Sequence, residues 1–265
     1  DTIAIRDTVK EEIQGGISSS ASGNLQNHEA KQAEDKAKEI AEISHSNPAE
    51  KLAVLGFECF RKKDYKVAAN LYEIATTIAP NESFAWHMWG TSLHYQANAE
   101  QKPHLLKEAL DKFEEATDIK EDYHQAFNNW GTALSSLADA TEDAAQKRKF
   151  FEEAFEKYKQ ATDIKKDNHE AFYNWGTALS GLANATEDAA QKRKFFEEAC
   201  EKYKQATDIK EDKHEAFFNW GNALNRLAQS TEPTEEKEKL FQQALAKYAL
   251  AIELKTEEYR YYFNR

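Results

Sequence analysis

A segment of 45 residues occurs twice in succession in this chain. Residues 124–168 and residues 169–213 differ at 7 of 45 positions, with no insertion or deletion between them. A repeat of this length is typical of proteins that stack small helical units, because each unit buries its apolar face only against its neighbours. The repeat therefore predicts an open stack of units rather than a domain built around one central core.

Within each copy, apolar residues recur at steps of three and four, which is the spacing of one face of an α-helix. Gly131 lies in the first such stripe, where a glycine costs about 1 kcal/mol relative to alanine. We therefore expect a partner helix to approach closely there, and we expect Thr141 to cap that second helix. The two stripes of the first copy are Phe127, Trp130, Leu134 and Leu137, followed by Phe151, Ala154, Tyr158 and Ala161.

The pattern continues on both sides of the tandem copies. We divide 48–258 into five units, namely 49–82, 83–123, 124–168, 169–213 and 214–258. The positions that these units share resemble the tetratricopeptide repeat (TPR) family. They are Leu52, Leu55, Gly56, Ala68, Tyr72, Ala75 and Pro80 in the first unit, Trp86, Trp89, Gly90, Ala109, Phe113 and Ala116 in the second, and Phe217, Trp220, Gly221, Ala244, Tyr248 and Ala251 in the fifth.

The resemblance implies an all-α fold, a right-handed superhelical solenoid of antiparallel helix pairs. A TPR unit has about 34 residues, and the units from 83 onward are longer, with the extra residues placed between the two helices. Those residues have a helical composition, so we expect a long-repeat variant with lengthened helices. In this respect the chain is similar to bacterial long-repeat proteins and, more loosely, to the plant mitochondrial import receptor.

The two ends of the chain depart from the repeat. Ile5, Val9 and Ile13 form a short apolar stripe, and a stretch rich in glycine and serine follows. We therefore expect 1–24 to be an amphipathic segment on a tether, whose residues 1–14 could dock on a repeat surface of the same or another molecule, and 25–47 to be a capping helix. Extending the register beyond 258 predicts that 259–265 begin a further, truncated helix.

Composition excludes several classes of function. The net charge of −12 argues against a nucleic-acid-binding protein, and no apolar run approaches the length of a membrane span. Cys59 and Cys200 lie in distant units, so they are not expected to form a disulfide. These observations favour a reducing compartment, and we expect a cytoplasmic protein without membrane insertion.

The polar side of the first helix in each unit is the main candidate site. In the resembled family, first helices line the concave groove in which peptides bind. An asparagine amide can both donate to and accept from a peptide backbone, so a row of asparagines suits an extended ligand of varied sequence. Asparagine could equally serve as a neutral filler or cap a neighbouring helix. The candidate peptide-binding residues are Asn128, Asn129, Thr132, Tyr173, Asn174, Thr177, Phe218, Asn219 and Asn222.

Other residue sets carry weaker signals. His124, His169 and His214 recur at 45 residues, too far apart to share one metal ion. The basic run 147–149 and its repeat at 192–194 could meet an acidic partner, although glutamates that follow within a turn favour pairing inside the helix. No catalytic set, cofactor motif or metal motif is evident, so we expect a non-enzymatic chain without cofactors.

These observations favour a scaffold that binds a protein or peptide segment in its groove. Two alternatives stay open. The chain could be the recognition or regulatory region of a larger enzyme whose catalytic domain lies outside it, or it could assemble with itself through the ends of the stack.

Overall fold

The computed structural model describes residues 47–263, with the backbone alone described for 257–263. The expected amphipathic segment and tether at 1–24, and the expected capping helix at 25–47 apart from its last residue, lie outside these residues. The described part folds into ten α-helices, which pack as sequential pairs and divide between two compact units, with the boundary in the chain after residue 119. The predicted all-α class with helices packed in sequential pairs is confirmed.

The first unit contains two helix pairs. They are α3 (Pro48–Arg61) with α4 (Tyr65–Ile78), and α5 (Ser83–Glu100) with α6 (His104–Ile119). Asn47 caps α3 by accepting a hydrogen bond from the backbone N–H of Ala49, and Asp64 caps α4 in the same way through Val67. Each cap satisfies a backbone donor that the helix itself leaves without a partner.

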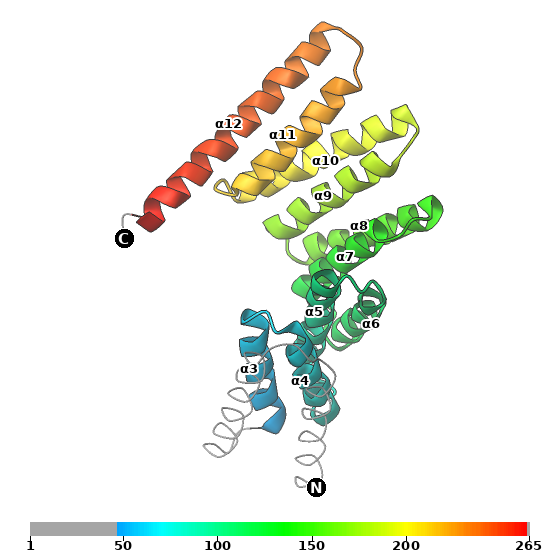
Figure 1. Cartoon of the computed structure of the whole chain (residues 1–265), viewed down its shortest axis with the longest axis vertical. Helices are drawn as coiled ribbons and strands as arrows, with labels where there is room; N and C mark the ends of the chain where they lie inside the picture. Colours follow the sequence, from blue (N-terminus) through cyan, green and yellow to red (C-terminus); the bar gives the residue numbers. More distant parts are fainter. Residues whose placement is uncertain (1–46, 264–265) are drawn as a thin grey trace. The chain divides into compact units, whose positions relative to one another are not determined.

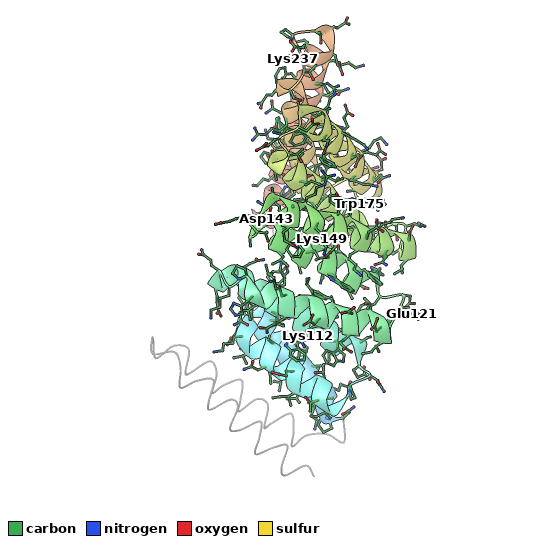
Figure 2. All side chains as sticks on the ribbon, turned by 90° about the vertical axis from the view of Figure 1, so that its right-hand side faces the viewer. Lys112, Glu121, Asp143, Lys149, Trp175 and Lys237 are labelled. Atoms are coloured by element: carbon green, nitrogen blue, oxygen red, sulfur yellow. The ribbon has the colours of Figure 1, made fainter. Side chains whose placement is uncertain are left out.

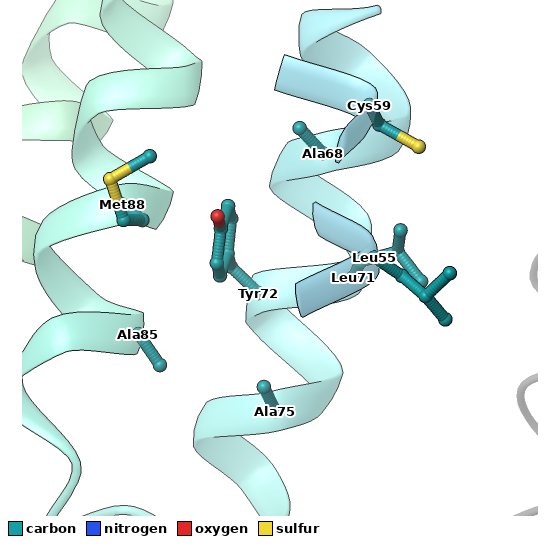
Figure 3. Close-up of a cluster of buried hydrophobic side chains, with 8 residues drawn as sticks. All are labelled: Leu55, Cys59, Ala68, Leu71, Tyr72, Ala75, Ala85 and Met88. Carbon is teal, nitrogen blue, oxygen red and sulfur yellow. The ribbon is translucent and has the colours of Figure 1, made fainter. Parts of the chain in front are cut away.

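The core of the first helix pair is small and dominated by Tyr72 (Figure 3). The ring of Tyr72 packs against Gly56, where an added Cβ would lie 2.9 Å from the Cζ atom of the ring. Ala85 and Met88 of α5 close the other side, so α4 is held between α3 and the next pair. The remaining buried members of the cluster are Leu55, Cys59, Ala68, Leu71 and Ala75.

The second unit contains the two long copies and the pair that follows them (Figure 1). Its pairs are α7 (His124–Asp139) with α8 (Ala144–Ile164), α9 (His169–Ala185) with α10 (Ala189–Ile209), and α11 (His214–Gln229) with α12 (Glu235–Phe263). The second helices α8 and α10 have 21 residues each, compared with 14 in α4, as expected from the extra residues between the helices.

Two local expectations were wrong in the second unit. Asp143, and not Thr141, caps α8, because its carboxylate accepts from the N–H of Gln146 at 2.7 Å, whereas the Thr141 hydroxyl donates back to Leu137 at the end of α7. In addition, α12 continues to Phe263 without interruption, so residues 259–263 extend this helix instead of beginning a further one.

The predicted close approach of a partner helix at Gly131 is present. In each pair of the second unit, a tyrosine ring of the second helix packs against a glycine of the first helix. An added Cβ at Gly131 would lie 2.7 Å from the Tyr158 ring, and Gly176 and Gly221 meet the rings of Tyr203 and Tyr248 in the same manner. A residue with a side chain at any of these positions would displace a ring from its helix–helix interface. The glycines therefore set the distance between the two helices of each pair.

The apolar stripe of α7 that contains Trp130 is only partly buried. Leu134 and Leu137 are buried as predicted, whereas Phe127 and Trp130 keep part of their surface exposed. The Nζ atom of Lys157 lies 3.4 Å from the centroid of the Trp130 ring, a cation–π contact that covers the ring. Lys112 with Trp89, Lys202 with Trp175 and Lys247 with Trp220 repeat this arrangement, and Figure 2 labels Lys112 and Trp175.

Candidate functional site

The first helices of the second unit lie next to one another. α7 contacts α9, and α9 contacts α11, whereas the second helices α8 and α10, over their described lengths, make no comparable contact. A stack whose first helices approach more closely than its second helices curves toward the first helices. The candidate residues on α7, α9 and α11 therefore share one face, on the inner side of this unit.

Asn128, Asn129, Asn174 and Asn219, which we call the asparagine row, form hydrogen bonds within and between neighbouring helix pairs. The Nδ2 atom of Asn174 donates to Oδ1 of Asn128 at 3.1 Å, which joins α9 to α7. The Nδ2 atom of Asn219 donates to the Tyr173 hydroxyl at 3.1 Å, which joins α11 to α9. Within α7, Asn128 donates in turn to Asn129 at 3.2 Å. Both Asn174 and Asn219 therefore reach back to the residue 46 positions earlier, a link that helical periodicity alone does not reveal.

The nine candidate residues differ in how accessible they are. Asn128 is buried, and Asn129, Thr132, Tyr173, Asn174 and Asn219 are half-buried. Thr177, Phe218 and Asn222 are exposed. The structure thus places all nine on one face, but several of their polar groups take part in holding the stack together. The exposed members are the ones with surface left for a ligand.

A second layer of hydroxyl groups supports this face from the paired helices. The Tyr158 hydroxyl donates to Thr132 at 3.4 Å and shares a hydrogen bond with Ser135 at 3.3 Å. Tyr203 repeats these contacts with Thr177 and Ser180, and Tyr248 donates to Asn222 at 2.9 Å. Burial raises the pKa of Tyr158 and of Tyr203 to about 12, so these phenols are neutral donors at physiological pH.

The face becomes more aromatic from α7 to α11. Asn128, Tyr173 and Phe218 occupy equivalent positions on the three helices, and the Phe218 ring lies 5.7 Å from that of Tyr248. The Nζ atom of Lys213 lies 4.5 Å from the Tyr173 ring centroid. The α7 end of the row therefore offers hydrogen-bonding groups, and the α11 end offers an apolar ring.

The recurring histidines do not form a metal site. The described residues contain no group of three or more His, Cys, Asp or Glu side chains able to hold an ion. His124 instead exchanges a hydrogen bond with Asn168 at 3.3 Å, in the turn between two pairs. Burial lowers the pKa values of His124 and His169, so both imidazoles favour the neutral form.

The basic runs lie within the first two turns of α8 and α10. Figure 2 labels Asp143, which precedes α8, and Lys149 of α8. Arg148 pairs with Glu152 at 2.8 Å, and Arg193 pairs with Glu197 at 2.8 Å. Arg148 also donates to Gln191 of the next pair, and Arg193 also pairs with Glu236. These arginines therefore bridge successive helix pairs.

Elsewhere in the chain, Cys59 and Cys200 are free thiols.

Comparison with known protein families shows which family this chain belongs to. The sequence model of the family described as "Plant specific mitochondrial import receptor subunit TOM20" matches residues 60–174 and again residues 165–263. The chain belongs to this family. The two matches overlap at residues 165–174, and together they cover the chain from residue 60 to residue 263. The comparison with curated proteins found no significant match.

Solved structures support the fold. A MamA protein from Desulfovibrio magneticus RS-1 is 14% identical, with a TM-score of 0.56 over 81% of this chain and 98% of that chain. YrrB, described as a TPR protein with an unusual peptide-binding site, is 19% identical, with a TM-score of 0.52 over 84% and 99%. A thermophilic TPR protein of Thermus thermophilus is 16% identical, with a TM-score of 0.54 over 79% and 96%. At these identities the likeness concerns the fold alone.

Family membership tests the expectations about the type of function and about the cellular location. The chain is a TPR-like protein-interaction module of an import-receptor family, which is not a family of enzymes. The expectation of a cytoplasmic protein was wrong, because the family is one of mitochondrial import receptor subunits. Composition could not show this, since a receptor's repeats need carry no organelle-specific chemistry. Among the described residues, no helix is both long and apolar enough to cross a membrane.

Proposed function

We propose that this chain is an import receptor subunit that binds a segment of a protein destined for the mitochondrion on the face formed by α7, α9 and α11. The observation that carries the proposal is the set of exposed side chains on that face, Thr177, Phe218 and Asn222, which border an asparagine row held in place by hydrogen bonds. Family membership supports the receptor role.

The rigidity of this face favours binding. Asn174 and Asn219 are oriented by bonds to the preceding helix, and Asn222 is oriented by the Tyr248 hydroxyl. Side chains that are already ordered lose little rotamer entropy when a ligand arrives. A backbone segment can therefore be held by the exposed Thr177 hydroxyl and Asn222 amide, while an apolar side chain of the ligand packs against Phe218.

The test is a binding titration with a purified, unfolded mitochondrial precursor protein, compared with the same protein lacking its import signal. The variant Thr177→Ala/Phe218→Ala/Asn222→Ala should weaken binding of the complete precursor at least tenfold while leaving helicity unchanged, since all three residues are exposed. A matched control, Lys159→Ala/Gln160→Ala, removes exposed side chains of α8 and should leave the affinity within twofold of the unmodified protein. Equal affinity for the two precursor forms would refute the receptor role.

A further inference from the structure

The turn that joins α3 to α4 carries a concentration of positive charge (Figure 1). Arg61 is the last residue of α3, Lys62 and Lys63 lie in the turn, and Lys66 lies in the first turn of α4. All four side chains are exposed. Residues 61–66 thus hold four cations, in a chain whose net charge is −12. We call Arg61, Lys62, Lys63 and Lys66 the basic patch.

The cations of the basic patch have no anionic partner in the part of the chain that the structure describes. None of their side chains forms an ion pair there, whereas Arg148 and Arg193 of the second unit each pair with a glutamate. The carboxylate of Asp64, in the same turn, accepts a hydrogen bond from the backbone N–H of Val67. Glu58, one helical turn before Arg61, offsets part of the charge. The basic patch therefore keeps most of its charge available for an external anionic ligand.

The corresponding turns of the second unit have the opposite charge. They join α7 to α8, α9 to α10 and α11 to α12, and their acidic residues are Glu142, Asp143, Glu187, Asp188, Glu232 and Glu235. Because these turns also connect the two helices of a pair, the packing of a pair does not require cations at this place. The basic patch is therefore a property of the first pair and not of the repeat.

Three aromatic rings adjoin the basic patch. Phe60 directly precedes Arg61, and Tyr65 directly precedes Lys66. Both rings pack against Tyr95 of α5, with ring centroids 5.2 and 5.3 Å apart. Tyr95 nevertheless keeps 46% of its surface exposed. Amphipathic aromatic rings and long cationic side chains are the residues that proteins place at the boundary between water and lipid.

The acidic residue at the end of α5 does not neutralise the basic patch. Glu100 pairs with Lys102 at 2.6 Å, and its pKa is lowered chiefly by the hydrogen bond from Lys102, with a further contribution from the positive charge of Lys66. The charge of Glu100 is thus already matched by Lys102. At about 0.15 M salt the Debye length is about 8 Å, so exposed acidic residues farther away are largely screened. The local positive charge therefore decides what the basic patch attracts.

We propose that the basic patch and Tyr95 bind the surface of a membrane that contains anionic lipids. Three of the four cations are lysines, and lysine is a flexible, strongly hydrated point charge that suits a broad charged surface. Recognition of one carboxylate in an acidic protein segment is better served by an ordered arginine fork, and Arg61 has no described partner that would orient it. The exposed Tyr95 ring inserts among the lipid headgroups beside the lysines.

This inference goes beyond the proposed function and does not rest on it. The precursor-binding face belongs to α7, α9 and α11, whereas the basic patch and Tyr95 belong to α3, α4 and α5. The ligand is also different, since a lipid surface is recognised by its charge and by its boundary with water.

The experiment measures binding of the full chain to two kinds of vesicle, one of phosphatidylcholine alone and one of phosphatidylcholine and phosphatidylinositol in equal amounts. We expect the chain to sediment with the anionic vesicles and to bind the neutral vesicles at least tenfold more weakly. A tenfold rise in salt concentration should release the unmodified chain from the anionic vesicles, because the attraction is electrostatic. Equal binding to both kinds of vesicle, or binding to neither, would overturn the inference.

A charge-removing variant tests whether the basic patch is responsible. Lys62→Gln/Lys63→Gln/Lys66→Gln should bind the anionic vesicles at least tenfold more weakly than the unmodified chain. All three side chains are exposed, so the helical circular dichroism signal should not change. The control Lys159→Gln/Lys165→Gln/Lys210→Gln removes the same number of exposed cations from the second unit and should bind within twofold of the unmodified chain. Equal loss in the two variants would show that net charge alone is responsible and would contradict the proposal.

A competitor distinguishes a membrane from an acidic protein. Polyglutamate, added to the chain without vesicles, should bind at least tenfold more weakly than the anionic vesicles. Tighter binding of polyglutamate would identify an acidic protein segment as the partner and overturn the inference. The variant Thr177→Ala/Phe218→Ala/Asn222→Ala should lose precursor binding but keep vesicle binding, whereas Lys62→Gln/Lys63→Gln/Lys66→Gln should do the reverse. Failure of the proposed function and failure of this inference therefore give different results.

Discussion

The ring of Tyr158 fills the space that a side chain on Gly131 would need, with its Cε1 atom 2.7 Å from the position of an added Cβ. The same ring carries a hydroxyl that reaches past Gly131 to Thr132 and Ser135 on α7. One residue pair thus sets the spacing of the two helices and supplies a polar anchor beneath the proposed peptide-binding face.

Gly131→Ala should destabilise the protein by about 1–3 kcal/mol, because the added methyl group must displace a tightly packed ring. Urea unfolding monitored by circular dichroism measures this loss. The cost should shrink in a Tyr158→Leu background, where the clashing ring is absent. An equal cost in both backgrounds would show that the loss does not come from displacing the Tyr158 ring.

Tyr72→Phe and Tyr158→Phe should have different effects, although both tyrosines are buried. The Tyr72 hydroxyl has no hydrogen-bond partner among the described residues, because Phe57 and Phe60 stand where Thr132 and Ser135 stand in the repeat. Removing the Tyr158 hydroxyl should cost about 0.5–1.5 kcal/mol, whereas Tyr72→Phe should be neutral or stabilising. Thermal unfolding of the two variants distinguishes these outcomes, and equal losses would contradict this explanation.

The stability of the α3–α6 unit should fall as the pH is lowered from about 6.5 to about 4. Burial lowers the pKa of His87 and that of His94 from 6.5 to about 4. In this window the unfolded state therefore binds more protons than the folded state, and acidification favours unfolding by up to about 1.4 kcal/mol per pH unit for each histidine. Urea unfolding of His87→Gln/His94→Gln should show a flatter pH dependence than the unmodified chain, and parallel curves would exclude these histidines.

Asn174→Ala/Asn219→Ala should weaken the contacts between helix pairs as well as any ligand binding. Asn174→Ala removes the hydrogen bonds to Asn128 and Thr132, and Asn219→Ala removes the hydrogen bond to Tyr173. Each hydrogen bond is worth about 0.5–1.5 kcal/mol. Asn184→Ala, an exposed position on α9, serves as the control and should leave the unfolding midpoint unchanged. If the double variant is as stable as the control, the row does not stabilise the stack.

Deletion of residues 1–24 tests whether the apolar stripe at Ile5, Val9 and Ile13 docks on a repeat surface. A docked segment competes with outside ligands, or links two molecules, so its removal should raise the affinity for a precursor protein or change the sedimentation coefficient. Replacing Ile5 and Val9 by serine in the full chain should have the same effect. If neither quantity changes, the segment does not occupy a ligand surface.

The sequence alone determined the features that depend on local periodicity. The 45-residue repeat and the stripes at steps of three and four predicted paired helices, and the isolated Gly131 predicted a close helix–helix approach, which the Tyr158 ring confirms. These features can be read from one segment because the helical period and the cost of a glycine are properties of neighbouring residues.

Only the tertiary structure decided which polar groups contact each other across the stack. The sequence placed Asn128 and Asn174 on one face, but their hydrogen bond depends on the offset and tilt between α7 and α9, which periodicity does not specify. The same limit explains why the apolar stripe includes Trp130 but does not predict the contact of its ring with Lys157 on the partner helix. Contacts between residues distant in the chain follow from the packing of whole helices, and this packing determines which residues of the asparagine row remain accessible to a ligand.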